Sequence, residues 1–254
     1  MDKLSVVIIT FNEEKNIGRC ILSVKAIADE IIVVDSFSTD NTRAICMEHQ
    51  VRFVEHNFEG YGMQKNIALG LASNDFVLSL DADEALDDSL IASIKNIRQQ
   101  GFKSAAYSMN RRTNYCGRWI LHGSWYPDTK VRLFNRNKIQ WNNDRIHEKP
   151  VIPPGVEVIH LTGDILHYSY TSIDEHVQQN NRFSTISAQA MFSNGKKTSL
   201  AKILFNPCWA FVSSYLIRAG FMDGFFGYVI AVNIAHLTFL KHIKLYQLQK
   251  KGVG

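Results

Sequence analysis

Cysteine is scarce in this sequence and follows no pattern. The 254 residues include four cysteines, Cys20, Cys46, Cys116 and Cys208, and none of them forms a CxxC pair or has the spacing of a zinc site. Their scarcity argues against a small secreted domain held by disulfides, and the sequence signature of structural zinc is missing. We expect reduced thiols and a cytosolic protein.

Other sequence signals are missing as well. Residues 1–10 contain no basic stretch followed by an apolar core, so we expect no signal peptide. No segment rich in proline, glycine and serine interrupts the chain, and no repeat or low-complexity stretch is present. Apolar residues make up 46% and charged residues 20% of the chain, which is typical of a globular protein with a sizeable core.

Acidic residues almost disappear from the last quarter of the chain. Residues 196–254 contain eight Lys or Arg and one acid, Asp223, whereas residues 1–195 contain twenty Lys or Arg and twenty-three acids. The net charges of the two parts are therefore +7 and −3. A basic tail on a weakly acidic body indicates an anionic partner, either nucleic acid or a phospholipid surface.

The composition of the tail favours the lipid surface over nucleic acid. Residues 224–240 form an uncharged run of 17 residues, at the lower limit for a membrane span, and Arg218 and Asp223 interrupt anything longer. Aromatic residues lie beside the basic end, as they do at membrane interfaces. We therefore expect residues 196–254 to form a basic, apolar helical segment that associates with a membrane. A helical hairpin packed on the protein or in a dimer interface is the alternative.

Two kinds of periodicity alternate through the first hundred residues. Apolar β-branched runs predict buried strands at residues 4–10, 31–34, 51–54 and 76–80, and helical spacing predicts helices at 12–28, 38–47, 61–72 and 89–99. This alternation is typical of a parallel sheet with right-handed crossovers. After Gly101 the pattern changes to short strands at 105–109, 131–134 and 165–168 among loops, followed by a helix at 172–193.

Acidic residues follow three of the four expected strands. Glu13 follows the first, Asp35 ends the second, and Asp81 and Asp83 follow the fourth. In an open α/β sheet the carboxyl ends of parallel strands meet in one crevice, where such folds bind ligands. Mg²⁺ typically takes one or two carboxylates plus substrate phosphates, so Asp81-Ala82-Asp83 predicts a metal with a nucleotide diphosphate. The alternatives are helix-dipole compensation for Glu13, a turn for Asp35, and a solvated helix cap for the Asp pair.

Four ordered segments resemble the motifs of family 2 glycosyltransferases. They are SVVIITFNEEKNI, IIVVDSFSTDNT, GYGMQKNIAL and FVLSLDADEAL, which lie within residues 5–86. Members of that family have the GT-A fold and use nucleotide sugars. The later stretches WYPDTKVRLF and RIHEKP resemble the branch of lipopolysaccharide core β-1,4-glucosyltransferases.

The resemblance implies an α/β protein with the GT-A fold, whose central sheet is Rossmann-like, mostly parallel and flanked by helices. Residues 1–195 would form the catalytic domain, with a nucleotide-sugar-binding half at 1–100 and an acceptor half at 101–195. Residues 196–254 would form the C-terminal helical segment that associates with a membrane.

The same resemblance implies roles for residues around the donor. Asp35 would contact the uracil or ribose. Asp83 would be the firmer ligand of Mg²⁺ or Mn²⁺, with Asp81 near the ribose or the metal. The run DSFSTD matches a family pattern, and its Phe37 stands where the family usually has glycine. The other residues expected around the nucleotide sugar are Thr10, Asn12, Glu13, Ser38, Lys65 and Asn66.

An acceptor hydroxyl is a weak nucleophile, so an inverting transfer benefits from a general base. Glu148 and Asp128 are the candidates, and Glu148 is preferred because it lies about one domain half beyond the Asp pair, as the family's base does. A local hydrogen-bonded pair is the alternative for His147-Glu148. His167 could be a further metal ligand or a satisfied core histidine. Arg132 is the basic residue expected to bind the donor diphosphate or an anionic acceptor.

The main hypothesis is an inverting, metal-dependent transferase that moves a hexose, glucose from UDP-glucose, onto a lipopolysaccharide inner-core heptose or a similar glycolipid. It would lie on the cytoplasmic face of the inner membrane as a peripheral protein, without nucleic acid, and could form a homo-oligomer. The alternatives are a polyprenyl-phosphate glycosyltransferase and a noncatalytic nucleotide-binding membrane adaptor. Nucleotidyl transfer is disfavoured, because FNEEKN stands where a glycine-rich phosphate loop would be needed.

Overall fold

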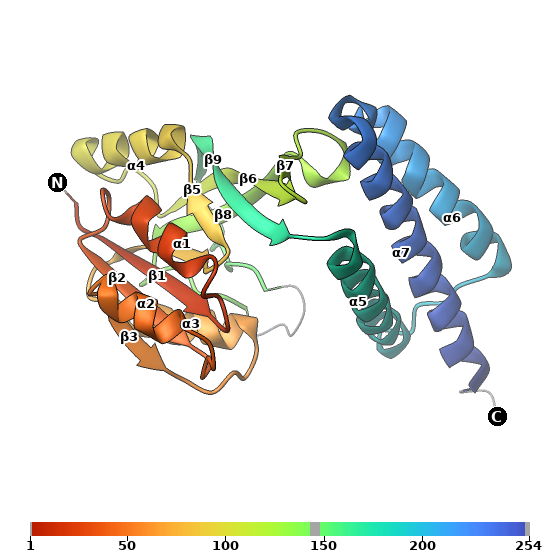
Figure 1. Ribbon diagram of the computed structural model, residues 1–254, viewed down its shortest axis with the longest axis horizontal. Helices are drawn as coiled ribbons and strands as arrows, with labels where there is room; N and C mark the ends of the chain where they lie inside the picture. Colours follow the sequence, from red (N-terminus) through yellow and green to blue (C-terminus); the bar gives the residue numbers. More distant parts are fainter. Residues whose placement is uncertain (1, 143–147, 252–254) are drawn as a thin grey trace. The chain divides into compact units, whose positions relative to one another are not determined.

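The computed structural model describes residues 2–142 and 148–251 (Figure 1). Contacts between residues group the chain into two compact units. The sheet unit comprises residues 1–111 and 128–168, and the helical unit comprises residues 112–127 and 169–254. These units place the helix that begins after Ser172 with the C-terminal helices. The division at residue 195 that the sequence suggests remains a prediction.

The central element is a mixed β-sheet. Its strands are β1 (Leu4–Thr10), β2 (Glu30–Asp35), β3 (Arg52–Glu55), β4 (Phe76–Asp81), β5 (Glu84–Leu86), β6 (Ala106–Tyr115), β7 (Arg118–Trp119), β8 (Asp128–Asn135) and β9 (Val158–Tyr170). Their order is β3-β2-β1-β4-β8-β6-β9-β5, and β7 pairs with β6.

The first half of this sheet is parallel, as the alternation of strands and helices predicts. Strands β3, β2, β1 and β4 pair in parallel, whereas the pairs β4–β8, β8–β6 and β5–β9 are antiparallel. Parallel neighbours require a crossover connection, and no long helix lies between β6 and β8. The expected α/β class is confirmed, and the antiparallel half makes the whole sheet mixed.

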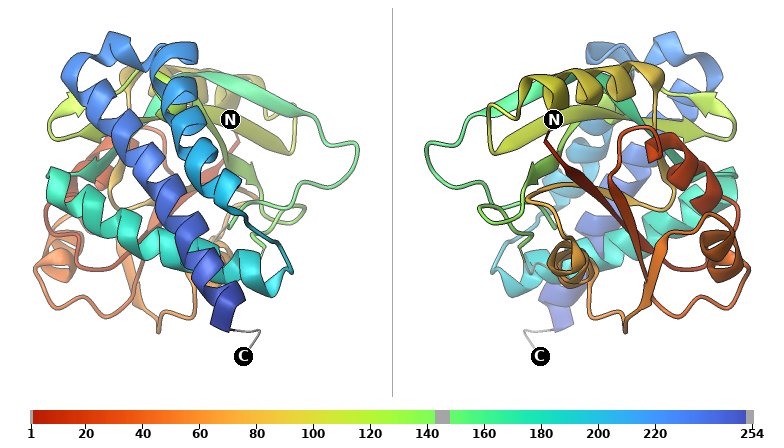
Figure 2. Two further views of the ribbon diagram at one scale, coloured as in Figure 1. Left: turned by 90° about the vertical axis from the view of Figure 1, so that its right-hand side faces the viewer. Right: turned by 90° about the vertical axis from the view of Figure 1, so that its left-hand side faces the viewer.

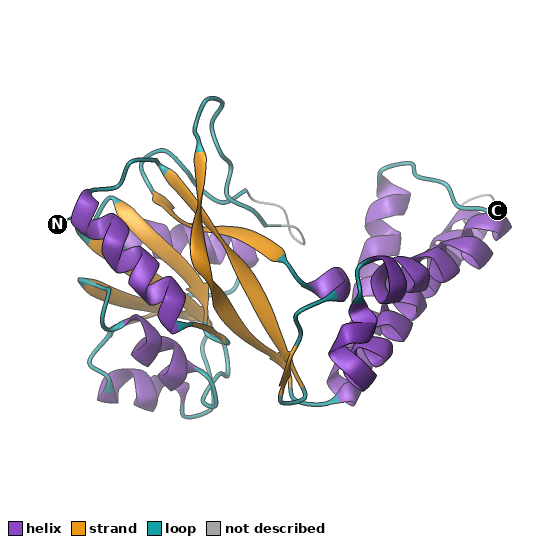
Figure 3. Cartoon of the chain, turned by 90° about the horizontal axis from the view of Figure 1, so that it is seen from above, coloured by secondary structure: helices purple, strands orange, loops and turns teal. Residues whose placement is uncertain are grey.

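Helices cover both faces of the parallel strands (Figure 3). They are α1 (Ile17–Val24), α2 (Thr42–Glu48), α3 (Tyr61–Leu71) and α4 (Asp88–Gln100). Alternate residues of β1 point to opposite faces: Val6 and Ile8 pack in a cluster with α1 and α4, and Val7 and Ile9 pack in a second cluster with α3. The central strand is therefore buried on both faces, as its continuous apolar run predicts.

The helical unit is built from three long helices, α5 (Ile173–Ser193), α6 (Leu200–Val212) and α7 (Gly224–Lys251), with the short turns η1 (Gly123–Trp125), η2 (Ser213–Ile217) and η3 (Gly220–Asp223). Helix α7 packs against both α5 and α6 (Figure 2). The predicted start of α5 is confirmed by a capping box, in which the side chains of Ser172 and Glu175 satisfy each other's backbone N–H groups.

Much of the apolar surface of this unit is exposed. The stretches Leu200–Ile217 and Gly220–Lys250 each contain an 18-residue window with a mean hydropathy of 1.3, and by length and composition alone they could cross a membrane. Only 11% of the residues in the apolar window of the first stretch, and 28% in that of the second, are buried. The most exposed large side chains are Leu200, Leu204, Phe205, Trp209, Ile217 and Phe225.

Asp223, the one acidic residue in residues 196–254, is buried and does not contribute to this exposed surface. Asp223 is 5% exposed and accepts hydrogen bonds from the backbone N–H groups of Leu121 at 3.2 Å and His122 at 2.9 Å. The Nδ1 atom of His122 also lies 3.0 Å from the Asp223 carboxylate. The exposed surface of residues 196–250 therefore displays basic side chains without acidic ones.

A buried histidine lies in the aromatic core of the helical unit. The ring centroids of Tyr115, Trp125 and Tyr170 lie 4.9–5.3 Å from that of His176, which is 2% exposed. The Tyr115 hydroxyl hydrogen-bonds to Nδ1 of His176 at 3.0 Å. Burial lowers the pKa of His176 to about 4, so the ring is neutral at physiological pH.

We expect the protein to lose stability as the pH falls from about 6.5 to about 4. In that window the unfolded chain binds a proton at His176 and the folded chain does not, so acid favours unfolding by up to about 3 kcal/mol. The variant His176→Gln keeps an acceptor for Tyr115 and should flatten this slope in urea titrations across the window. The exposed His160→Gln serves as the control, and equal slopes in the two variants would contradict the assignment.

Candidate active site

Three strand ends place polar side chains together at the carboxyl edge of the parallel strands. In the register of the sheet, Thr10 of β1 lies opposite Asp35 of β2, and Ile9 lies opposite Asp81 of β4. This is the convergence that the positions of the acids predict. Thr10 and Asp35 are buried, and the Thr10 hydroxyl has no hydrogen-bond partner within the described residues. This hydroxyl is available to form a hydrogen bond with a ligand that binds at this edge.

Asp35 organises the loop that follows β2. One of its oxygens accepts a hydrogen bond from the Ser38 N–H at 2.7 Å, and the other accepts one from the Ser38 hydroxyl. That hydroxyl accepts the Asn12 N–H at 2.7 Å, and the Asn12 side chain accepts the Thr39 N–H at 2.8 Å. Phe37 turns the chain with a φ of 61°, in the region that favours glycine. The loops after β1 and β2 are thus one hydrogen-bonded structure.

Glu13 lies in the turn before α1. Its carboxylate accepts a hydrogen bond from the Asn16 side chain at 2.7 Å, and its backbone N–H donates to the Thr42 hydroxyl at 2.8 Å. Burial raises the pKa of Glu13 against the opposing effect of the Asn16 bond, and the charge of Asp83 raises it further. Glu13 is therefore close enough to Asp83 to sense its charge.

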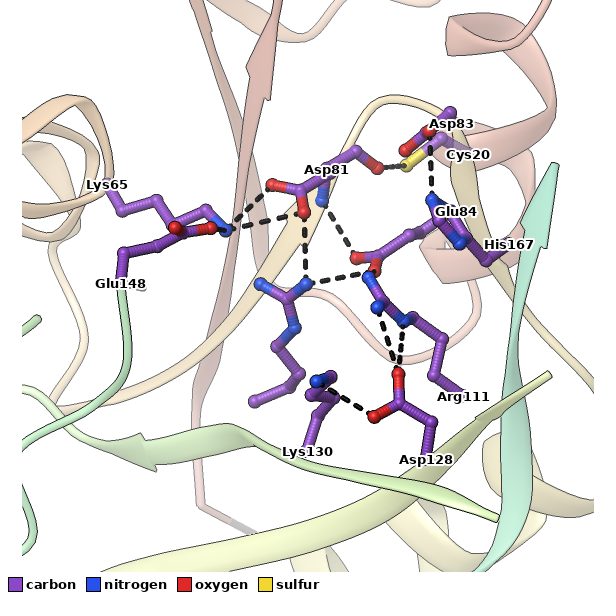
Figure 4. A network of polar contacts seen from close by, with 11 residues as sticks. Cys20, Lys65, Asp81, Asp83, Glu84, Arg111, Asp128, Lys130, Glu148 and His167 are labelled. Atoms are coloured by element: carbon purple, nitrogen blue, oxygen red, sulfur yellow. Dashed lines mark hydrogen bonds and ion pairs between the residues drawn. The ribbon is translucent and has the colours of Figure 1, made fainter. Parts of the chain in front are cut away.

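A cluster of buried charges surrounds Asp81 (Figure 4). The Nζ of Lys65, on α3, lies 3.0 Å from Oδ1 of Asp81, and Nη2 of Arg132, on β8, lies 3.0 Å from Oδ2. Arg132 also lies 2.9 Å from Glu84 of β5, and Glu84 accepts the Asp81 N–H at 3.0 Å. Lys65, Arg132 and Glu84 are all buried. Two cations therefore share the Asp81 carboxylate.

These cations fix the charge of Asp81. Burial alone raises its pKa, but the charges of Lys65 and Arg132 outweigh burial and hold the pKa far below its ordinary value. Burial lowers the pKa of Arg132, and the charges of Glu84 and Asp81 outweigh that effect and raise it. Nε and Nη1 of Arg132 are buried and have no hydrogen-bond partner among the described residues. Arg132 thus keeps donors for an anionic ligand.

Glu84 and Arg111 are also part of this cluster, and their pairing is not predicted from the sequence. Arg111 Nη1 lies 3.4 Å from Glu84, and Arg111 Nη2 lies 2.9 Å from Asp128. The available signal was a third carboxylate directly after the Asp81-Ala82-Asp83 motif. The pairing of β8 with β6 that brings both arginines to Glu84 is a long-range feature that local periodicity does not report.

We expect Glu84→Ala to lower the free energy of unfolding by about 3–5 kcal/mol, because it leaves Arg132 buried with half of its counterions. Urea denaturation measures the loss. Glu55→Ala is the matched control: Glu55 forms an exposed ion pair with Arg43, and its removal should cost about 1 kcal/mol or less. Similar losses in the two variants would show that the Glu84 cluster does not stabilise the sheet unit.

Asp83 faces a histidine. Its Oδ2 lies 3.1 Å from Nε2 of His167 on β9, and its backbone carbonyl accepts the Tyr168 N–H at 2.9 Å. The second ring nitrogen of His167, Nδ1, is buried without a hydrogen-bond partner within the described residues. The side chains of Asp83 and His167 are 25% and 15% exposed, so a ligand can reach them from solvent.

The spacing of these two side chains suits a shared metal ion. Adjacent ligands of an octahedral ion at about 2.1 Å lie about 3.0 Å apart, close to the 3.1 Å between Asp83 and His167. A carboxylate suits Mg²⁺ or Mn²⁺, and neutral imidazole is a common metal ligand. Residues 2–142 and 148–251 contain no group of three or more His, Cys, Asp or Glu that could hold a metal. Oxygens from a bound donor would have to complete the coordination.

The two candidate bases differ in how strongly they are paired. Oδ2 of Asp128 lies 3.0 Å from Nε and 2.9 Å from Nη2 of Arg111, and Oδ1 lies 2.8 Å from Lys130. In the described part of the chain Glu148 has a single ion pair, 3.5 Å from Lys65, and its side chain is 22% exposed. Both oxygens of Asp128 are engaged by cations, whereas among the described residues Glu148 contacts only Lys65.

Asn66, one of the two residues expected to reach the donor from α3, bonds to the protein itself. Its amide group donates to the Trp141 carbonyl and accepts the Trp141 N–H, both at 2.9 Å. Lys65 instead lies beside Asp81 at the carboxyl edge. His147, whose pairing with Glu148 is the alternative to a general-base role for Glu148, lies outside the described residues.

Comparison with known proteins identifies related sequences along nearly the whole chain. The family model Glycosyl transferase family 2 matches residues 5–153. An uncharacterized glycosyltransferase of Rickettsia typhi is 34% identical over 99% of this chain and 89% of its own length. The lipopolysaccharide core biosynthesis glycosyltransferase LpsC of Rhizobium meliloti is 30% identical over 96% of this chain and 92% of its own length.

Solved structures show a more distant likeness. Residues 1–349 of Staphylococcus aureus TarS, in complex with UDP, align with 98% of this chain and 92% of that chain, at 16% identity and a TM-score of 0.49. Glucosyl-3-phosphoglycerate synthase from Mycobacterium tuberculosis aligns over 44% of each chain, at 24% identity and a TM-score of 0.36.

Proposed function

Because the chain belongs to glycosyl transferase family 2, we propose that this glycosyltransferase moves a hexose, glucose from UDP-glucose, onto a lipopolysaccharide inner-core heptose or a similar glycolipid. The transfer would invert the sugar's anomeric centre and depend on Mg²⁺ or Mn²⁺. The observation that carries the proposal is the meeting of Thr10, Asp35 and the Asp81-Asp83 pair at one edge of the sheet, with His167 beside Asp83.

The donor's nucleoside would lie against the loops after β1 and β2. The Thr10 hydroxyl there has no hydrogen-bond partner among the described residues, and Asp35 holds the Phe37 turn that would border the base. Asn12, Glu13 and Ser38 belong to the same hydrogen-bonded structure. We assign these residues to donor binding, with Asp35 as the group that fixes the shape of the loop.

The donor's diphosphate would lie at the end of β4. Asp83 and His167 would hold the metal, which supplies positive charge for the departing diphosphate. The buried guanidinium of Arg132 would add donors from the other side, since two of its nitrogens are unpartnered within the described residues. Asp81 would keep Lys65 and Arg132 in place and would not give up its charge, because both cations depress its pKa.

Glu148 would accept the proton of the attacking hydroxyl. Its contact with Lys65 at 3.5 Å connects it to the Asp81 cluster, so the base and the diphosphate end of the crevice share one network. Asp128, paired with Arg111 and Lys130, would instead order the neighbouring acceptor loop. General-base assistance of this kind contributes typically about 10²–10⁴-fold to a rate.

The acceptor and the location rest on two further observations. The relative LpsC is named for lipopolysaccharide core biosynthesis, and the helical unit displays apolar and basic side chains together. An amphiphilic acceptor would be met at the membrane surface, so we place the protein on the cytoplasmic face of the inner membrane as a peripheral protein.

The experiment that tests the proposal combines cells and purified protein. Glycolipid from cells lacking this protein should be shorter by one hexose in mass spectra, and purified protein with Mn²⁺ should restore that hexose from UDP-glucose. An unchanged glycolipid together with no transfer across a panel of nucleotide sugars would refute the function. A phosphoprenyl sugar as the product would instead establish the polyprenyl-phosphate alternative.

A further inference from the structure

The helical unit contains a pocket far along the chain from the acidic motifs. Its volume is about 440 Å³, and it lies where the turn after α5 meets the last turns of α7. Three lysines line it, Lys196 and Lys197 from the turn and Lys250 from α7. None of the eight described residues that line the pocket is acidic. A volume of this size is typical of sites for small molecules or headgroups.

Hydrogen bonds fix the walls of this pocket. Gln249 of α7 donates to the Lys196 carbonyl at 3.2 Å and accepts the Thr198 N–H at 3.4 Å. The Thr198 hydroxyl lies 2.9 Å from Nδ1 of the buried His242. These bonds fasten the lysine-bearing turn to α7, so the backbone of the pocket is defined before any ligand binds.

No acidic side chain among the described residues that line the pocket offsets the charge of its lysines. Within residues 2–142 and 148–251 none of the three lysines forms an ion pair, and Lys250 lies 5.6 Å from the ring centroid of Tyr246, which holds it near the wall. A concave site lined by one sign of charge concentrates ligands of the opposite sign. Leu200 and Leu204, each 65% exposed, follow the turn along α6 and set apolar surface next to the basic site.

We propose that this pocket binds the phosphate group of an anionic lipid headgroup at the membrane surface. The lysines would take the phosphate while the apolar residues of α6 contact the acyl region, which is the arrangement that an amphiphile requires. The inference deepens the membrane association in the proposed function and rests on that part of it. The same phosphate chemistry occurs in soluble compounds, which the test below separates from a lipid.

The test compares two triple variants of the full chain. One removes the pocket charges (Lys196→Gln, Lys197→Gln, Lys250→Gln), and the other removes three exposed charges elsewhere in the helical unit (Arg118→Gln, Arg182→Gln, Arg218→Gln). Partition is measured by cosedimentation with vesicles of phosphatidylcholine containing phosphatidylglycerol. A basic residue at an anionic surface contributes about fivefold to partition, so the pocket variant, which lacks three, should lose on the order of 100-fold. The control variant should lose clearly less.

A second measurement identifies the source of the phosphate. Glycerol 3-phosphate and inorganic phosphate are titrated separately in calorimetry without vesicles. Absence of binding in solution, with the loss in vesicles, supports a headgroup presented by a bilayer. Tight binding of either soluble compound, abolished in the pocket variant, would overturn the lipid assignment in favour of a soluble phosphate ester. An equal loss of partition to vesicles in both triple variants would refute the proposed role of the pocket in lipid binding.

The test of the pocket and the test of the proposed function can fail independently of each other. Sugar transfer to a detergent-solubilised acceptor should be unchanged in the pocket variant, since its lysines belong to the helical unit and the residues assigned to donor binding belong to the sheet unit. Failure of transfer in the unmodified protein would refute the proposed function and leave vesicle binding unaffected.

Discussion

Replacing Glu148 by glutamine should lower kcat by about 10²–10⁴-fold while the protein stays folded. Glutamine preserves the size of the side chain and removes its ability to accept the hydroxyl proton. Steady-state kinetics with UDP-glucose and purified glycolipid would measure the loss.

Asp128→Asn is the matched comparison for this prediction. It changes a second carboxylate of the same network whose oxygens are engaged by Arg111 and Lys130. We expect it to raise the KM for the acceptor and to lower kcat much less than Glu148→Gln does. If Asp128→Asn lowered kcat by about 10²–10⁴-fold and Glu148→Gln left kcat unchanged, the two roles would be reversed.

Asp83→Ala should abolish measurable transfer and weaken the binding of Mn²⁺. The reason is that Asp83, at the carboxyl edge of the sheet, provides the carboxylate of a donor pair with metal-ligand spacing, 3.1 Å from His167. Electron paramagnetic resonance of Mn²⁺ in the presence of UDP measures the metal directly, without relying on turnover. His167→Ala should weaken Mn²⁺ binding in the same assay.

Asp88→Asn is the control for charge. Asp88 is an exposed carboxylate in the first turn of α4, five residues after Asp83. Its neutralisation should leave Mn²⁺ affinity and transfer close to those of the unmodified protein. Retained Mn²⁺ binding in Asp83→Ala would remove Asp83 from the metal site, even if activity were lost.

The parts of the fold that could be predicted are those encoded in local runs of residues. Strands β1 and β4 are long apolar runs, and their expected bounds agree with the structure to within one residue. Strand β5 has three residues, too few to show a period, and it was not expected. The ordered motifs indicated the family, and the match over residues 5–153 confirms that interpretation.

The sequence predicts the positions of the acidic residues in the candidate site better than it predicts which basic residues pair with them. Glu13, Asp35, Asp81 and Asp83 follow strands, so the sheet itself places them at one edge. The partners of Asp81 come from α3 and β8, and no local pattern reports which of many basic residues a long-range pairing will deliver. The amide of Asn66 bonds to the Trp141 backbone from a distant part of the chain, which local periodicity does not report either, and its role at the donor stays a prediction.

The burial of both faces of β1 affects how this strand aligns with its neighbouring strands during folding. Both faces of the strand carry similar β-branched side chains, so a slip by one residue would exchange near-equivalent apolar groups and cost the core little. The polar ends of the strand must therefore select the alignment. Ser5 bonds to Glu30 and to the Asn74 N–H at one end, and Thr10 lies opposite Asp35 at the other. A mispaired strand would lose the hydrogen bonds of Ser5 to Glu30 and Asn74. Ser5, at the end of β1 away from the crevice, therefore helps to keep the crevice residues in register.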